Sequence, residues 1–294
     1  MLRKVGRYLI TRGAFSFMSD KAFLKLSYFL HTKKKLDLKN PKLFNEKLQW
    51  LKLYNRKPEY TNMVCKYEAK KYIANIVGEK YVIPTLGVWD KFEDIDFDTL
   101  PDQFILKCTH DSGGLIICKD KSKLDMEWAR NKINKTLKND YYITAREWPY
   151  KNVKRRIIAE SIIEDKKTGY LKDYKFFCFD GCVKCLYVTS NRGLEGGLKM
   201  DYFDPDWNHL PIKHYKYPNN ENDVPQMPPN YKEMINIAEK LSKGIPHLRV
   251  DLYNIDGQIY VGELTFFIDA GYGEMKPDEY NRIFGEWIKL PEKR

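Results

Sequence analysis

Two Asp-Gly pairs in the second half of the chain constrain its fold more than any other feature. Asp180-Gly181 and Asp256-Gly257 each lie between runs of aromatic and branched residues. An Asp-Gly pair in this setting is the strongest short-range signal for a β-hairpin, because both residue types tolerate the positive φ of a tight turn. The second half is therefore predicted to be rich in antiparallel hairpins.

The first half shows helical periodicity instead. Residues 1–57 predict helices and connectors, including a helix at 20–31, and residues 66–76 continue in helical period. Further helices are predicted at 126–137 and 231–242, an aromatic loop at 141–150, and short strands at 81–84, 104–107, 115–118 and 156–163. This mixture predicts an α+β fold, with an N-terminal helical segment at 1–57, a first lobe at 58–154 and a second lobe at 155–294.

Charge and composition narrow the class of partner. The chain has 294 residues and a formal charge of +11, which favours an anionic ligand. No zinc spacing, RNP-like strand or helix-turn-helix pattern indicates nucleic acid, so a small or polymeric acidic substrate is expected. The sequence shows no long apolar run and no signal-peptide pattern, which predicts a cytoplasmic protein. Six cysteines, mostly in apolar runs, predict reduced core thiols.

The N-terminal helix is followed by a basic cluster. Lys33, Lys34, Lys35 and Lys39 come after residues 20–31. With further basic residues at the N-terminus, this segment can touch an anionic membrane surface. A solvated basic face on a packed helix is the favoured interpretation.

The second Asp-Gly hairpin carries the residues with the clearest chemistry. A three-residue loop at 255–257 would place Asp251 opposite Val261, so that Arg249, Asp251 and Glu263 share one face. Glu263 would then lie opposite Arg249 and diagonal to Asp251. Two carboxylates beside a cation suit a magnesium ion bridged to ATP, whereas the alternative is an exposed charged face.

Phosphate-binding candidates lie on other segments. Lys107 ends a buried strand just before the loop Ser112-Gly113-Gly114, whose backbone N–H groups are open to close approach. Lys175 lies on a strand otherwise built of aromatic residues. No Walker phosphate loop is present.

In this order, these residues resemble the ATP-grasp superfamily. Over residues 36–291 the chain is similar to the teichuronopeptide-biosynthesis branch, which acts in the assembly of bacterial surface polysaccharides. The segments that carry the resemblance are residues 38–41, 44–51, 66–67, 104–107, 110–114, 146–148, 157–160, 173–176, 250–253 and 262–266.

The resemblance implies an ATP-grasp fold, in which two α+β lobes clasp ATP. Lys66 and Lys107 would contact the phosphates, while Asp251 and Glu263 would hold Mg²⁺. The strand end would carry the adenine through backbone groups of Glu160, Ser161, Ile162 and Ile163. Two positions depart from the pattern: Thr265 stands where a metal-binding asparagine is frequent, and Cys65 where this branch commonly has aspartate.

The expected activity is an ATP-dependent ligation of a carboxylate to an amine through an acyl phosphate. Arg249 matches the arginine that stabilises the tetrahedral intermediate, and Lys107 assists phosphoryl transfer. The resemblance further implies a uronic acid of a surface glycan as donor and a small amine as acceptor. The candidates for holding this substrate are Arg146, Trp148, Tyr150 and Lys199.

Three alternatives remain open. Cys178, Cys182 and Cys185 have the spacing of a radical S-adenosylmethionine cluster, although core cysteines in a hairpin explain them better. Asp204-Pro-Asp206 offers the acidic pair of a metal-dependent glycosyltransferase, although a turn is the favoured interpretation. A polysaccharide-binding protein at a membrane surface is the non-enzymatic alternative.

Overall fold

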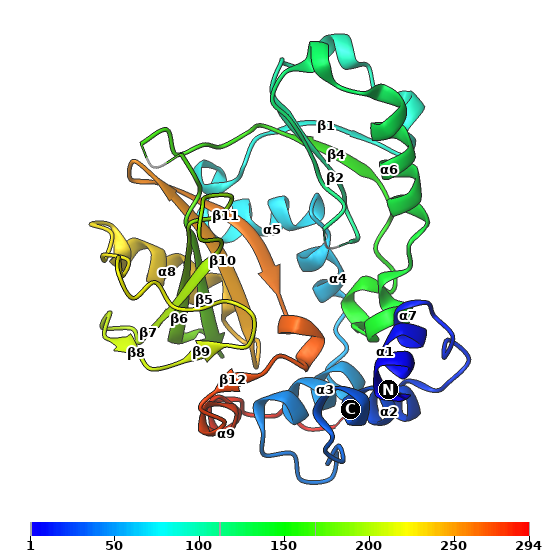
Figure 1. Ribbon diagram of the computed structural model, residues 1–294, viewed down its shortest axis with the longest axis vertical. Helices are drawn as coiled ribbons and strands as arrows, with labels where there is room; N and C mark the ends of the chain where they lie inside the picture. Colours follow the sequence, from blue (N-terminus) through cyan, green and yellow to red (C-terminus); the bar gives the residue numbers. More distant parts are fainter. Residues whose placement is uncertain (1, 112, 168, 294) are drawn as a thin grey trace.

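Two antiparallel sheets face each other above a base of helices (Figure 1). The computed structural model describes residues 2–111, 113–167 and 169–293. The helices are α1 (Leu2–Thr11), α2 (Asp20–Thr32), α3 (Phe44–Tyr54), α4 (Glu59–Val64), α5 (Glu68–Val77), α6 (Met126–Lys138), α7 (Tyr141–Ala145), α8 (Tyr231–Ser242) and α9 (Glu279–Trp287).

The smaller sheet has four strands in the order β1-β4-β2-β3. These strands are β1 (Thr85–Trp89), β2 (Phe104–Cys108), β3 (Ile116–Cys118) and β4 (Ile157–Glu160). On β2, Phe104, Leu106 and Cys108 alternate with less buried residues and face a separate apolar core with α6. This alternation leaves Lys107 on the opposite face, toward the larger sheet.

The larger sheet has six strands in the order β11-β10-β5-β6-β7-β8. They are β5 (Asp173–Phe179), β6 (Cys182–Ser190), β7 (Lys199–Phe203), β8 (His209–Leu210), β10 (Leu248–Ile255) and β11 (Gln258–Thr265), and a separate pair is formed by β9 (Lys213–His214) and β12 (Met275–Lys276). Helix α8 packs its predicted apolar stripe against β5, β6 and β10. The charged face of β10 is thereby directed away from α8.

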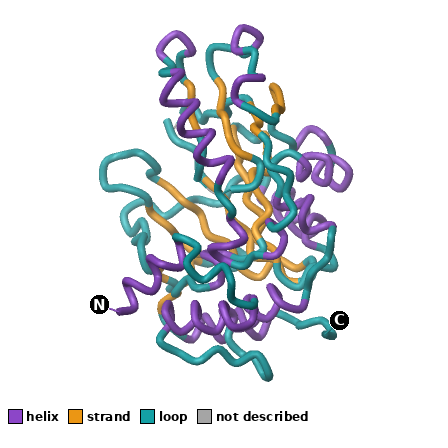
Figure 2. Tube along the Cα trace, turned by 90° about the vertical axis from the view of Figure 1, so that its right-hand side faces the viewer, coloured by secondary structure: helices purple, strands orange, loops and turns teal. Residues whose placement is uncertain are grey.

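The helical base joins distant parts of the chain. Helix α3 packs against α9, and α1 packs against α2. Figure 2 shows both termini at this end of the molecule. Gly285 of α9 permits the close approach to α3, because a Cβ there would lie 2.1 Å from the Lys42 carbonyl oxygen. None of the helices in the described ranges is long and apolar enough to cross a membrane.

The Asp180-Gly181 hairpin forms as expected, with Phe179 paired to Cys182 across a two-residue turn. At the second hairpin the predicted three-residue loop is wrong. Ile255 pairs with Gln258, so the turn consists of Asp256 and Gly257 alone, both at positive φ. Two-residue turns of this kind match the right-handed twist of the strands.

A β-bulge in this second hairpin changes which residues of the two strands lie opposite each other. Leu252 pairs with Val261 but Asp251 pairs with Glu263, which leaves Gly262 as the extra residue. A Cβ at Gly262 would lie 2.6 Å from the Tyr253 ring, so glycine allows the bulge. As a result Glu263 lies directly opposite Asp251 rather than diagonal to it, and Arg249 lies opposite Thr265.

Local structure differs from expectation at two further places. The strand predicted at 81–84 does not form: Tyr81 ends a 3₁₀ turn, Glu79–Tyr81, and Val82 makes an isolated bridge to Val261 before β1 begins. The predicted aromatic loop contains α7 and a second 3₁₀ turn, Trp148–Tyr150. The expected reduced thiols are confirmed: all six cysteines are free, and five of them are buried.

A buried histidine in the core makes stability depend on pH. His247 is 1% exposed, packs against Phe44 and Phe179, and donates from Nδ1 to the Cys178 carbonyl oxygen at 3.1 Å. Burial lowers the pKa of His247 from 6.5 to about 3, because the apolar surroundings disfavour the imidazolium.

We therefore expect the free energy of unfolding to fall as the pH drops below 6.5 toward 3. The imidazole of the unfolded chain binds a proton in this pH range, whereas the buried imidazole does not. The free energy of unfolding therefore falls by about 1 kcal/mol for each pH unit. Urea unfolding of wild type and His247→Asn from pH 7 to pH 4.5 measures this term, because asparagine keeps the donor but does not titrate. Parallel pH profiles for the two proteins would contradict the assignment.

Candidate functional site

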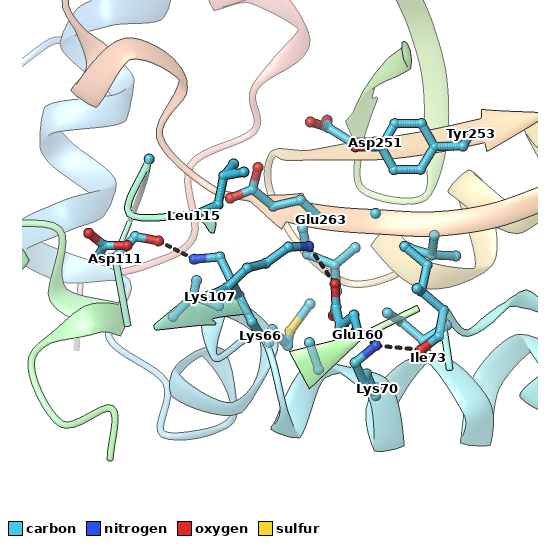
Figure 3. Close-up of a pocket in the computed structure, with 18 of the residues that line it drawn as sticks. Lys66, Lys70, Ile73, Lys107, Asp111, Leu115, Glu160, Asp251, Tyr253 and Glu263 are labelled. Atoms are coloured by element: carbon cyan, nitrogen blue, oxygen red, sulfur yellow. Dashed lines mark hydrogen bonds and ion pairs between the residues drawn. The ribbon is translucent and has the colours of Figure 1, made fainter. Parts of the chain in front are cut away.

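A cavity of about 190 Å³ lies between the two sheets. Its lining comes from α4, α5, the β2–β3 loop and β4 on one side, and from β5, β10 and β11 on the other (Figure 3). We call it the central cavity. Eight charged residues line it: Lys66, Lys70, Lys107, Lys175, Asp111, Glu160, Asp251 and Glu263.

The wall of the larger sheet carries a row of charges with alternating sign. The row consists of Glu263, Arg249, Asp251, Lys175, Asp173 and Arg192. Burial lowers the pKa of Lys175, but the Asp251 carboxylate beside it more than offsets this, and the net pKa is raised. Lys175 is therefore charged at neutral pH, where it can pair with an anion that enters the cavity.

Arg249 is held by contacts on three sides. Its Nε and Nη2 atoms donate to the two Asp251 oxygens at 2.6 and 2.8 Å, and Nη2 also donates to the Thr265 hydroxyl at 3.0 Å. A forked pair of this kind fixes the guanidinium plane. Nη1 contacts the Tyr187 hydroxyl at 3.4 Å, and the Glu263 carboxylate lies 3.9 Å away. Thr265, which departs from the superfamily pattern, therefore helps to orient Arg249.

Asp251 and Glu263 fit the expected metal site as two ligands of an incomplete set. Among the residues that the structure describes, no group of three or more His, Cys, Asp and Glu side chains is arranged to hold an ion. Magnesium is commonly bound by one or two carboxylates together with phosphate oxygens and water. The pair therefore suits an ion that arrives with a nucleotide.

On the opposite wall, one buried carboxylate holds two lysines. Glu160 contacts Lys107 at 2.5 Å and Lys70 at 2.9 Å. Burial alone raises the pKa of Glu160, but the two ammonium groups outweigh it and the pKa lies below 4.5. Sequence reasoning missed Lys70, although its position one helical turn after Lys66 was an available signal.

The glycine loop closes one end of the central cavity. Lys66 donates from Nζ to the Asp111 carbonyl oxygen, and Gly113 and Gly114 line the cavity. A Cβ at Gly114 would lie 2.5 Å from Thr136, so only glycine fits there. Ser112 lies outside the described residues.

The other predicted contacts lie away from this cavity. Ser161 donates its N–H to the Pro84 carbonyl oxygen at 3.1 Å, and Ser161, Ile162 and Ile163 are half-buried beyond the end of β4. Only Glu160 of this segment lines the central cavity, through its side chain. The role of the segment in holding adenine stays a prediction.

The four predicted substrate contacts lie in different surroundings, and of these Tyr150 lies near the charged row, where burial and the Glu263 carboxylate raise the pKa of its hydroxyl. Arg146 is buried, and its Nη2 donates to the Ser16 carbonyl oxygen at 2.9 Å, so it anchors the segment between α1 and α2. Trp148 and Tyr150 lie in the following 3₁₀ turn, where Tyr150 packs against Tyr141. Lys199 begins β7 and pairs with Ser190. None of the four lines the central cavity as described.

The alternative chemistries receive no support from the geometry. Cys178 and Cys185 are buried in the core, whereas Cys182 is exposed. Asp204 accepts hydrogen bonds from the backbone N–H groups of Asp206 and Asn208 at 3.0 and 2.8 Å, which closes the expected turn.

We expect Glu160→Gln to destabilise the protein at pH 7 by up to about 3 kcal/mol, because two lysines lose their shared carboxylate. The pKa of Glu160 is lowered in the folded state. Its contribution to the free energy of unfolding is therefore present above pH 4.5 and is lost as the pH falls further. Denaturant unfolding at pH 7 and at pH 3.5 tests both points. Glu93→Gln is the control, because Glu93 is 56% exposed and its pair with Arg130 is worth little. Equal losses in the two variants would refute this role of Glu160.

Comparison with protein-family models gives a match over most of the chain. The family model for TupA-like ATP-grasp proteins matches residues 46–289. Comparison with curated protein sequences gives no match.

Solved structures show more distant similarity. The D-alanine–D-alanine ligase of Helicobacter pylori is 12% identical, with 86% of this chain and 68% of that chain covered and a TM-score of 0.48. The D-alanine–D-alanine ligase of Bacillus anthracis in complex with ATP is 18% identical, with coverages of 70% and 55% and a TM-score of 0.40. The ATP-grasp ligase PsnB, complexed with a minimal precursor, Mg and ADP, is 12% identical, with coverages of 75% and 57% and a TM-score of 0.40. The chain spans little more than half the length of the latter two.

Proposed function

Because the chain belongs to the TupA-like ATP-grasp family, we propose that it is an ATP-dependent ligase that joins a carboxylate to an amine. The observation that carries this proposal is the placement of Arg249, Asp251 and Glu263 on one face, across the central cavity from Lys66 and Lys107. The lysines of one wall suit the phosphates of a nucleotide, and Asp251 and Glu263 on the other wall suit its metal ion.

Each charged group then has a defined task. Lys66, Lys70 and Lys107 bind phosphate oxygens, while Asp251 and Glu263 would hold a magnesium ion, which would neutralise charge on the phosphates. Lys175, now paired with Asp251, is the fourth cation that the phosphates can reach. In this scheme the ion pairs between protein groups are exchanged for pairs with the nucleotide and its metal.

The proposed reaction has two steps. A carboxylate oxygen attacks the γ-phosphorus, the bond to ADP breaks, and an acyl phosphate forms. An amine nitrogen then attacks the acyl carbon, loses a proton, and expels phosphate. Arg249 stabilises the oxyanion of the tetrahedral intermediate, because it is fixed in advance by Asp251 and Thr265.

We further propose a uronic acid of a bacterial surface glycan as the carboxylate donor and an amino acid or another small amine as the acceptor. The likeness to the teichuronopeptide branch supports this choice, as does the charge of +11, which attracts acidic ligands. The reaction would then take place on the cytoplasmic side of the membrane, where ATP is available.

Loss of the metal ligands should abolish turnover, and at Asp251 it should also lower the melting temperature, because Arg249 and Lys175 lose their shared carboxylate. Asp251→Asn and Glu263→Gln are each expected to reduce magnesium-dependent ADP release, measured with galacturonic acid and a mixture of amino acids, by at least about 100-fold. They should also remove the rise in melting temperature that Mg-ATP gives the wild type, since only a ligand that binds the native state raises it.

The control is Asp256→Asn at the tip of the same hairpin, where the side chain is 57% exposed and asparagine tolerates the positive φ. This variant should keep full activity. Wild-type ADP release by the Asp251→Asn, Glu263→Gln double variant would exclude the metal site, and a melting temperature that no adenine nucleotide changes would exclude the ligase.

A further inference from the structure

Two more cavities continue from Arg249 away from the central cavity. The inner cavity, of about 130 Å³, is bounded by Arg249 and by aromatic side chains that include Tyr187 and Tyr202. Asp251, which holds Arg249, lines the central cavity. Arg249 therefore stands at the junction between the proposed site of phosphoryl transfer and the inner cavity.

The outer cavity is larger, at about 580 Å³, and lies next to the inner one. The two share Lys216, Asp269, Gly273 and Glu274 as lining residues. Its far wall is α1, which lies beside α7 in Figure 1. Arg7, Ile10 and Thr11 of α1 line the cavity together, because residues three and four apart share one face of a helix.

The outer cavity carries two basic and two acidic side chains: Arg7, Lys216, Asp269 and Glu274. Among residues 2–111, 113–167 and 169–293, no hydrogen bond or ion pair engages the half-buried Arg7 guanidinium. Lys216 is exposed, and its ammonium lies 5.1 Å from the centre of the Tyr215 ring. Asp269, one of the two acids, lies 3.6 Å from His214. The Arg7 guanidinium is thus available to a ligand carboxylate, and Lys216, which interacts with Tyr215 and Asp269, is a second cation at the wall.

The aromatic lining favours a sugar over a simple anion. Tyr215 is 45% exposed, and its ring lies 4.5 Å from that of His214, which in turn stacks on Tyr217 at 5.2 Å. Tyrosine offers an apolar ring together with a polar hydroxyl. The apolar face of a pyranose can pack on such a ring while its hydroxyl groups form hydrogen bonds at the edge.

We infer that the outer cavity binds the distal units of an acidic oligosaccharide whose reacting carboxylate lies beside Arg249. This inference rests on the proposed ligase function. Arg7 and Thr11 lie outside the residues 46–289 that the family model matches, so selectivity for an extended substrate comes from a helix outside the matched region.

Calorimetric titration in the presence of Mg-ADP, with galacturonic acid and its linear trimer as probes, tests the inference. Wild type should bind the trimer at least about tenfold more tightly than the monomer, because only the trimer reaches Arg7 on the far wall. Arg7→Gln and Lys216→Met should each lower this preference several-fold. Arg12→Gln is the matched control, since Arg12 is exposed directly after α1 and lies outside the cavity.

Equal affinity for monomer and trimer, an unchanged preference in both variants, or tighter binding of a triglutamate peptide would each overturn the inference. The titration needs no turnover, so the two proposals fail separately. Trimer preference without ADP release from Mg-ATP would overturn the ligase and leave the outer cavity in place. ADP release with the monomer and no trimer preference would overturn the inference about the outer cavity and leave the ligase in place.

Discussion

The structure depends on one buried carboxylate, Asp251, which is held between two cations. Its partners Arg249 and Lys175 come from the same strand and from the neighbouring strand, so the pairing of β10 with β5 fixes all three. Charges taken out of water are costly unless they are paired and hydrogen-bonded, and removal of one partner costs more than the pair itself contributes. The sheet register is therefore constrained by electrostatics as well as by the apolar face that packs on α8.

The same constraint recurs on the opposite wall, where Glu160 holds Lys70 and Lys107. Without a ligand, the four lysines and four carboxylates of the central cavity balance one another. A nucleotide adds negative charge and its metal adds positive charge, so binding of both exchanges partners without leaving a buried charge unpaired. This balance explains why cations and carboxylates are interleaved rather than gathered into one patch.

The sequence predicted the α+β class, both hairpins, helix α8 and most of the charged residues of the cavity. It failed on the register of the second hairpin, because a bulge at Gly262 depends on the approach of the Tyr253 ring, which no local pattern encodes. Lys70 was missed because its partner Glu160 is distant in sequence and reaches it only in the folded chain. The role of Thr265 was missed for a related reason. No sequence motif marks a hydroxyl that accepts a hydrogen bond from an arginine on the neighbouring strand.

In the proposed function, Arg249 links the chemistry to the selection of substrate. Its guanidinium is fixed on the side of the central cavity by Asp251, and it bounds the inner cavity on the other side. In the proposed reaction, a carboxylate that reaches Arg249 from the inner cavity meets the transferred phosphoryl group there, while the remainder of its molecule extends toward α1. Binding energy gained far from the reacting carbon then holds the carboxylate in position, which lowers the entropic cost of reaction. An enzyme built in this way can change its substrate by altering the helices at the outer cavity while the phosphate-binding walls stay the same.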